Sequence, residues 1–577
     1  MSASAADSNA TRDNPLSCLG RKSYVSQRAL AQILAEIKEL PEVPAATSRS
    51  SVKRAREKHT GSMETCFGPV MQDISLRTLS GACVKTPVLH PGAMLSYAAE
   101  HCEPFAQLLS DRLKNRPSTF QDPWRFLWYS DEVSPGNQLK HCNARKVQVI
   151  YYSLAELQSH ALTCETMWFT LLVLRSTTVA QLGGMQALWR QLADLFFAQP
   201  DFTHGVPLKL QGASVMFYAK LGVMISDEAA LKQTFANKGA SGLIFCLACQ
   251  NATDARSTVT RYADEGQLVS SLETNISKFR QHTPDSIGQT MRYLEEQAAR
   301  LSKAEFDKLQ TALGFNFRPD GLLAHPAYGP PSIACVMYDW FHIYLVHGIF
   351  NIHTGLFLGD LHQHGWKSHT IDEFANSFTW PARIRGGASK NLLHKRSSHS
   401  EALKCSASEG LNFLAVLRVF ALNFVFDVCN EELKESCLAW LSLCRVLDAL
   451  QAVATTPTQP AHLQKLIKAH LDMTKQVHGE GWWIPKCHLA LHLPLQLHAH
   501  GCLLSCFVHE RKHKIAKQMQ IMCWTPARPS SAAFWMMFCT RMCDALLMRL
   551  PCQTQACTCW NHSAPPQGSC AKRFRMS

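Results

Sequence analysis

The chain has 577 residues, a length that is large for one hydrophobic core and indicates two to four structural units. Hydrophobic residues make up 46% and charged residues 18% of it, so the composition is globular and excludes an intrinsically disordered protein. Its 58 Lys and Arg against 45 Asp and Glu give a formal net charge of +13, which suits a polyanionic partner but is spread over a long chain.

The N-terminal stretch Met1–Gly20 is polar and has no apolar core, so we expect no secretory signal peptide. The most apolar long segment, Ala532–Leu550, contains Arg541, Asp544 and Arg549, and we therefore expect no membrane span. These features predict an intracellular protein whose 23 cysteines are reduced. Cysteine pairs at ligand spacing then favour zinc over a disulfide.

Residues 1–118 are predicted to form an accessory region with a helical pattern over Tyr24–Leu40. The run "SVKRAREKH", Ser51–His59, is basic and lies in a Ser/Thr-rich setting. A run of this kind is either a solvated segment, a nuclear localisation signal or a DNA contact.

Residues 119–256 show a strand-rich pattern. The predicted strands are Trp124–Asp131, a segment that starts at Lys146, Met167–Leu174 and Lys220–Ser226. Turn residues Pro135–Asn137 join the first two strands as a hairpin, and Val179–Phe197 has apolar residues at helical spacing. Three strands in a meander, a helix and a further strand are the order that opens an RNase H-like fold.

Two acids stand where that fold places catalytic carboxylates. Asp131 ends the first predicted strand and Asp227 follows the fourth. The alternative for each acid alone is an ordinary cap or turn residue, because Asp is common at such places.

Residues 257–481 are helical by pattern, mainly over Leu268–Leu313 and Leu411–Val453. We therefore predict a mixed α/β core with a large all-helical insertion, so that the whole chain is helix-rich. Residues 482–522 are predicted to close the core. The segment 523–577 has seven cysteines and no clear periodicity, which is typical of a poorly ordered tail or an altered reading frame.

A basic segment follows the predicted insertion and opens with Glu510. Ile515, Met519 and Met522 form an apolar stripe, and a helix with this pattern would present one carboxylate to a metal and several cations to a phosphate backbone. The predicted DNA-contacting side chains are Arg511, Lys512, Lys514 and Lys517. The alternative is an ordinary amphipathic basic helix.

Two pairs of metal-type residues flank the insertion. Cys246 and Cys249 form a Cys-x-x-Cys, and His488 and His492 are four residues apart, as two ligands on one helical face would be. Zinc takes four ligands at a structural site, so the two pairs predict one zinc that staples the start of the insertion to its end. The alternative is two buried free cysteines and two capping or core histidines.

The motifs "WYSDEVSPGNQL", "VMISDEAAL", "GLIFCLACQN", "MYDWFH", "CHLALHL" and "FVHERKH" together resemble the catalytic core of eukaryotic cut-and-paste DDE transposases, the CACTA type and its relatives. The resemblance covers about 123–518 and implies that Asp131, Asp227 and Glu510 are the three catalytic acids. "DWFH" gives a rival second acid, Asp339, with His342. We rank Asp339 lower because it lies inside the predicted insertion and not at the end of a core strand.

The resemblance implies a nuclear, DNA-processing enzyme that cleaves element ends and transfers strands. Three clustered carboxylates would hold two Mg²⁺ or Mn²⁺ ions about 4 Å apart for phosphodiester displacement. DNA is the expected partner, with a homo-oligomer left open. The sequence has no evident zinc finger or helix-turn-helix for reading DNA ends, and this favours the alternative of an inactive, transposon-derived DNA-binding remnant.

Overall fold

The computed structural model describes residues 63–134, 146–197, 201–259, 261–262, 266–378, 380, 392–393, 402–513 and 517, together with Ile37. The chain divides into two compact units, Met1–His59 and Thr60–Ser577. The predicted basic run, the turn at 135–137, the Cys-rich tail and Lys514 lie outside the described residues. The elements and sites described below belong to the second unit.

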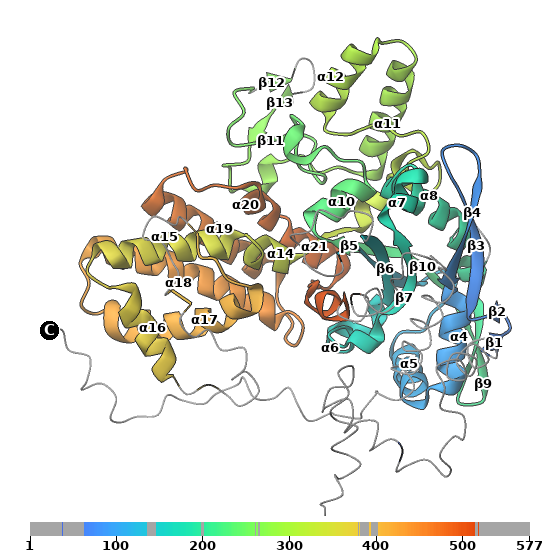
Figure 1. Cartoon of the computed structure of the whole chain (residues 1–577), viewed down its shortest axis with the longest axis horizontal. Coiled ribbons are helices and arrows are strands. Elements are labelled where there is room, and N and C mark those ends of the chain that lie inside the picture. The colour runs from blue at the N-terminus through green and yellow to red at the C-terminus, as the bar shows by residue number, and fades with distance from the viewer. Residues whose placement is uncertain are drawn as a thin grey trace, which may run out of the picture. The chain divides into compact units, whose positions relative to one another are not determined.

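A five-stranded mixed sheet lies at the centre of this unit (Figure 1). Its strands are β5 (Trp124–Val133), β6 (Val147–Leu154), β7 (Phe169–Arg175), β10 (Ala219–Ser226) and β15 (Val336–Tyr338). Their order across the sheet is β15-β10-β5-β6-β7. The pairs β5/β6 and β6/β7 are antiparallel, whereas β10 runs parallel to both β5 and β15. The predicted mixed α/β fold is confirmed, as are the four strands expected between 124 and 226.

The sheet is buried on both faces, which explains its near-continuous apolar and aromatic runs. Every residue of β6 is buried, and Trp128 of β5 packs edge-on against Trp189 with ring centroids 5.7 Å apart. Trp189 belongs to α8 (Met185–Phe196), whose buried stripe of Met185, Leu188, Leu192 and Phe196 matches the predicted helix. The short helix α7 (Ser176–Gln181) precedes it.

A β-bulge in β10 brings its backbone close to β5. The register shifts between Leu221 and Val223, and a Cβ built on Gly222 would lie 2.4 Å from Cβ of Arg125. Glycine is therefore required where the two parallel strands approach most closely.

Part of the predicted accessory region packs within the second unit. The hairpin of β3 (Met71–Arg77) and β4 (Cys83–Leu89) contacts β7. Two helices follow, α4 (Pro91–His101) and α5 (Glu103–Asn115), and α4 contacts a second hairpin. That hairpin consists of β8 (Val206–Leu210) and β9 (Ala213–Phe217). The compact unit thus begins near residue 60 and not near 118.

Helices dominate the second half of the chain. Those placed around the sheet and over the predicted insertion are α10 (Glu228–Thr234), α11 (Pro284–Ala298), α12 (Lys303–Leu313), α13 (Gly329–Ser332), α14 (Trp340–Leu345), α15 (Ile349–Gln363), α16 (Ser368–Ser377), α17 (Ala407–Phe420), α18 (Glu431–Ala452), α19 (Pro460–His478), α20 (Pro485–Ala490) and α21 (Leu493–His500). A π-helical turn, Ala421–Val425, follows α17.

The prediction that 257–481 is all-helical is wrong in two respects. The strand β15 belongs to the core sheet, and its three buried residues are too few to show a periodic pattern. Short strand pairs also occur at β11 (Ala252–Thr253) with β14 (Val269–Ser270), and at β12 (Arg261–Tyr262) with β13 (Gly266–Gln267). The region therefore returns to the sheet once before it ends.

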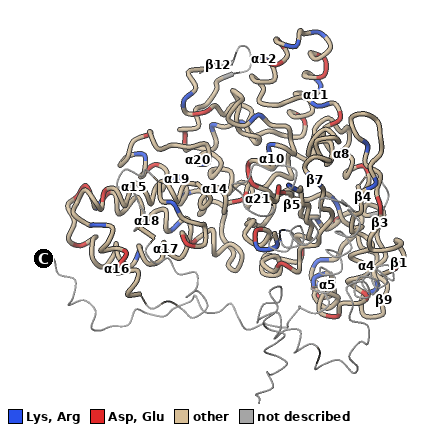
Figure 2. Tube along the Cα trace, viewed as in Figure 1, with Lys and Arg blue, Asp and Glu red and all other residues tan. Residues whose placement is uncertain are grey.

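Two helical stretches, Trp340–Gln363 and Ala407–Val425, are long and apolar enough to cross a membrane by length and composition. The first is 72% buried inside the fold, as the core helix of a globular protein would be. Figure 2 shows lysine, arginine, aspartate and glutamate residues scattered over many of the described elements. The expectation of no membrane span stays a prediction.

Candidate functional site

The four predicted metal ligands lie together in the interior. Cys246 and Cys249 come from the loop after α10, His488 from α20 and His492 from the turn that begins α21, and all four are buried. Both cysteine sulfurs lie 3.4 Å from Nε2 of His492, and Sγ of Cys249 lies 3.5 Å from Nε2 of His488. The two imidazole Nε2 atoms are 3.2 Å apart.

These spacings fit the coordination shell of a tetrahedral ion. With Zn–S about 2.3 Å and Zn–N about 2.0 Å, a sulfur and a nitrogen ligand stand about 3.5 Å apart, and two nitrogen ligands about 3.3 Å. All four ligand atoms lie within 4.8 Å of one another. The group can therefore hold a metal ion such as zinc.

Neighbouring side chains support the metal-ligating group from outside. The hydroxyl of Tyr338 lies 3.5 Å from Sγ of Cys246, and Nε2 of Gln281 lies 3.6 Å from Sγ of Cys249. Burial alone would raise the pKa of Cys246, but the Cys249 thiol and the two imidazoles outweigh it and hold that pKa well below its usual value. A thiolate is the form that binds a metal.

Asp131 and Asp227 lie at the ends of neighbouring strands. Ser226 Oγ donates to the backbone carbonyl of Ser130 at 2.9 Å and accepts from the backbone N–H of Ser130 at 3.2 Å. These two bonds connect β10 to β5 next to the two acids. Asp227 is the N-cap of α10, where its Oδ1 accepts from the backbone N–H of Ala230 at 2.7 Å. Asp227 is therefore a helix cap, as the alternative interpretation expected. Its other oxygen stays free to bind a cation.

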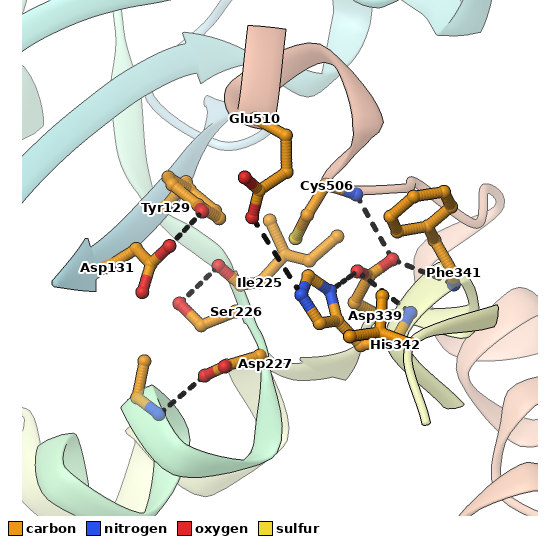
Figure 3. Close-up of polar contacts among 12 residues, drawn as sticks. Tyr129, Asp131, Ile225, Ser226, Asp227, Asp339, Phe341, His342, Cys506 and Glu510 are labelled. Atoms are coloured by element: carbon orange, nitrogen blue, oxygen red, sulfur yellow. Dashed lines mark hydrogen bonds and ion pairs between the residues drawn. The ribbon is translucent and has the colours of Figure 1, made fainter. Parts of the chain in front are cut away.

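Glu510 reaches the same place from a helix over 507–513. Its carboxylate lies 3.8 Å from Nε2 of His342 and 3.7 Å from Nδ1 of His513, and the latter nitrogen is also 3.8 Å from Oδ2 of Asp131. Figure 3 shows Asp131, Asp227 and Glu510 on three separate elements around one site. Asp131 and Glu510 offer ligand atoms within 4.8 Å of one another, together with His513, whereas Asp227 is not part of that group. Asp227 follows the neighbouring strand β10 and its charge acts on Asp131, so the three predicted acids lie in one region of the fold although they are far apart in the sequence.

The rival acid Asp339 directly follows β15, so our reason for ranking it lower is wrong: it does end a core strand. Its side chain has no exposed surface, and its two oxygens accept four hydrogen bonds. The donors are the backbone N–H groups of Phe341, His342 and Cys506, and Nδ1 of His342. Two oxygens offer about four lone pairs, so an ion held by Asp339, His342 and Cys506, whose ligand atoms lie within 4.8 Å of one another, would have to displace one of these hydrogen bonds.

The other three acids keep free acceptor capacity. Asp131 accepts from the Tyr129 hydroxyl at 3.0 Å and from the Glu132 backbone N–H at 2.6 Å, one bond on each oxygen. Asp227 accepts the single capping bond, and the Glu510 carboxylate lies 40% exposed. Oxygen atoms with open lone pairs are what a hard divalent cation requires.

Crowded negative charge affects Asp131 but not Glu510, whose pKa burial would raise but His513 and His342 lower. Burial raises the pKa of Asp131 to about 6, with the charges of Asp227 and Glu510 acting in the same direction against His513. Burial would lower the pKa of His342, but its hydrogen bond to Asp339 and the surrounding carboxylates raise it. A cation placed among the acids would relieve their mutual repulsion.

The predicted DNA-contacting residues do not form one exposed face. Lys512 is only 1% exposed; its Nζ donates to the backbone carbonyls of Glu165, at 3.1 Å, and Trp168, and burial lowers its pKa to about 7. Arg511 donates to the Glu165 carboxylate at 2.9 Å. The prediction for Lys512 is wrong because a buried ammonium cannot reach a phosphate, whereas Lys517 is partly exposed.

Sequence reasoning missed the residues that support the acids. His513 lies three positions after Glu510 on the same helical face, a spacing that could have identified it. Tyr129 lies two positions before Asp131 on the same face of β5. Sequence reasoning did not single out Cys506, whose backbone N–H and thiol both face Asp339.

The chain matches no model of a known protein family and no curated protein sequence.

Proposed function

We propose that the chain is a DDE-type polynucleotidyl transferase that acts on DNA, with Asp131, Asp227 and Glu510 as the ligands of two Mg²⁺ or Mn²⁺ ions. The observation that supports this most is the convergence of three carboxylates with open lone pairs from β5, the end of β10 and the distant helix over 507–513. The saturated acid Asp339 is a support for His342 and for the start of that helix.

The sheet supports an RNase H-like core. An antiparallel meander of β5, β6 and β7 is followed by β10 and β15, which add in parallel on the other side of β5. This is the arrangement that the resemblance to DDE transposases implies, with the first acid on the first strand and the second just after the fourth.

The residues of the site can do the following chemistry. Bound divalent ions would activate a water or a 3′-hydroxyl and stabilise the charge that develops on the scissile phosphate. Asp131 and Asp227 on adjacent strands fix one side of the ion site, and Glu510 closes it from the helix. His342 has its Nδ1 bound to Asp339, which directs Nε2 toward Glu510 and the site.

The buried Cys246, Cys249, His488 and His492 group is proposed to hold a structural zinc. It would connect the loop behind Asp227 to the segment ahead of Glu510, because the two halves of the site flank these acids in sequence. No catalytic role is assigned to it, since all four positions of a tetrahedral shell are protein ligands.

The decisive experiment is a nicking and strand-transfer assay on supercoiled DNA with Mg²⁺ or Mn²⁺. Asp131→Asn, Asp227→Asn and Glu510→Gln should each abolish cleavage and leave DNA binding intact, because the amide keeps the shape and removes the charge that holds the cation. Asp227→Asn is well matched to the fold, since Asn caps a helix as well as Asp does.

Cleavage that survives Asp227→Asn but is lost in Asp339→Asn with the fold intact would contradict our assignment of the second acid. A wild-type protein that binds DNA in a salt-dependent way but never cleaves it would support the remnant instead. Nuclear localisation and DNA as the partner are parts of the same proposal, and imaging of the tagged protein tests the first.

A further inference from the structure

The helix that carries Glu510 is attached to the core by an unusual set of contacts. It spans 507–513, and its last five residues, 509–513, are all polar or charged. Three of them, His509, Lys512 and His513, are nevertheless only 0%, 1% and 2% exposed. Polar residues this deeply buried need a structural reason.

Lys512 is fixed by backbone carbonyls. Its ammonium donates to the carbonyls of Glu165 and Trp168, at the two ends of a 3₁₀ turn, Glu165–Met167, that enters β7. Its Nζ also lies 5.3 Å from the ring centroid of Tyr151 on β6. These contacts hold the helix to one end of the central sheet.

His509 is fixed by stacking. Its ring lies parallel to that of Tyr129, with centroids 3.9 Å apart and planes 5° apart, and it meets the edge of Trp168 at 4.0 Å. Among the described residues neither ring nitrogen has a hydrogen-bond partner, so the imidazole serves as a flat ring. Tyr129 is also the donor to Asp131, so the same ring contacts the helix and the first acid.

We propose that Lys512 and His509 are positioning residues that set Glu510 opposite Asp131, and that Lys512 is not a DNA contact. The proposal rests on the proposed function, in which Glu510 is a metal ligand. Lys512 anchors the helix to the turn before β7, and His509 anchors it to Tyr129 on β5. Glu510 lies between these two anchors in sequence and is thereby directed at the acids.

The test compares Lys512→Met with Lys517→Met, which removes a charge from a partly exposed position nearby. Lys512→Met should lower kcat and raise the half-saturating Mn²⁺ concentration by about tenfold or more, as loss of a ligand-orienting partner does. The salt dependence of DNA binding should stay unchanged. If Lys512 contacted a phosphate, its replacement would instead reduce the slope of log binding constant against log salt concentration by about 0.9.

For His509 the matched pair is His509→Phe and His509→Ala. Phenylalanine keeps the stacked ring, so His509→Phe should leave kcat and the half-saturating Mn²⁺ concentration unchanged. His509→Ala should lower kcat and raise the half-saturating Mn²⁺ concentration, as Lys512→Met does. Rescue by phenylalanine shows that the ring and not an imidazole nitrogen is needed. Loss of activity in His509→Phe at unchanged thermal stability would overturn the stacking role.

A readout independent of cleavage separates this proposal from the proposed function. The backbone N–H of Glu510 bonds the Cys506 carbonyl at 3.0 Å, and its hydrogen exchange reports whether the helix is docked. Lys512→Met and His509→Ala should speed this exchange, and His509→Phe should not. Hydrogen exchange at Glu510 tests the positioning role even if the wild type never cleaves DNA. Equal protection of this N–H in Lys512→Met and in the wild type would overturn the positioning role.

Discussion

If the Cys246, Cys249, His488 and His492 group holds the proposed zinc, removal of that ion should destabilise the second unit measurably. The four ligand atoms already stand 3.2–3.5 Å apart in the pairs described above, close to the edges of a zinc tetrahedron. All four side chains are buried, so without the ion they leave polar atoms in an apolar interior.

The size of the effect can be worked out from linkage. An ion that binds the folded chain only, at about 1,000 times its dissociation constant, stabilises the fold by about 4 kcal/mol. Replacement of Cys249 by Ser removes one of four ligands and the hydrogen bond from Gln281. We therefore expect Cys249→Ser to lose most of that stabilisation and a strong chelator to do the same to the wild type.

The assay combines metal analysis with thermal unfolding at fixed free zinc. Wild-type protein should contain about one zinc per chain by this ligand count, and the midpoint temperature of its unfolding should rise with the free zinc concentration. Cys502→Ser is the control, because Cys502 is partly buried and is not among the four ligands. Full zinc content in a Cys246→Ser, Cys249→Ser double variant would refute the reasoning.

Three further predictions concern stability. Burial lowers the pKa of His470 to about 3 in the folded chain, while an unfolded histidine titrates near about 6.5, so this residue alone should remove about 2 kcal/mol of stability by pH 5. Denaturant titrations at pH 7 and 5 should show a fall of at least this size, because burial also lowers the pKa values of His282 and His353. Asp339→Asn replaces one oxygen by an NH2 group, which leaves two of the four donors without an acceptor and should cost about 2–4 kcal/mol. Asp227→Asn should cost less than about 1 kcal/mol, and equal urea midpoints of unfolding for the two variants would contradict the difference in lone-pair use. Gly222→Ala places a Cβ 2.4 Å from Cβ of Arg125 and should lower stability by about 2 kcal/mol or more, which thermal unfolding can check.

Four strands and one helix between 124 and 226 were predictable because each has a long pattern of its own, whereas the short hairpin of β8 and β9 was not predicted. The alternating or continuous apolar runs of β5, β6, β7 and β10 are bounded by turn residues, and α8 shows a complete apolar stripe. Such local patterns can be recognised without knowing which other elements pack against them. The metal-ligating group was predictable for a similar reason, since two spaced pairs of rare ligands leave few ways to complete a tetrahedron.

The strand β15 was not predictable in the same way. Its three residues sit in the apolar run that continues into α14, and only pairing with Met224–Ser226 distinguishes them from a helix. The error on Lys512 has a related cause. A helical wheel assigns a charged residue to the solvent, whereas this ammonium finds two carbonyls from a turn more than 340 residues away in the chain.

The choice between Asp227 and Asp339 shows what the fold adds to the motifs. Both acids cap a helix directly after a core strand, so a local pattern cannot separate them. They differ in burial, since Asp227 is partly exposed and Asp339 is buried, and in how many donors converge on them: one for Asp227, and four for Asp339. Three of those four donors are backbone N–H groups, and one comes from a segment 167 residues away. Lone-pair occupancy is therefore a property of the folded chain, and it separates a carboxylate that can bind a cation from one that holds the site together.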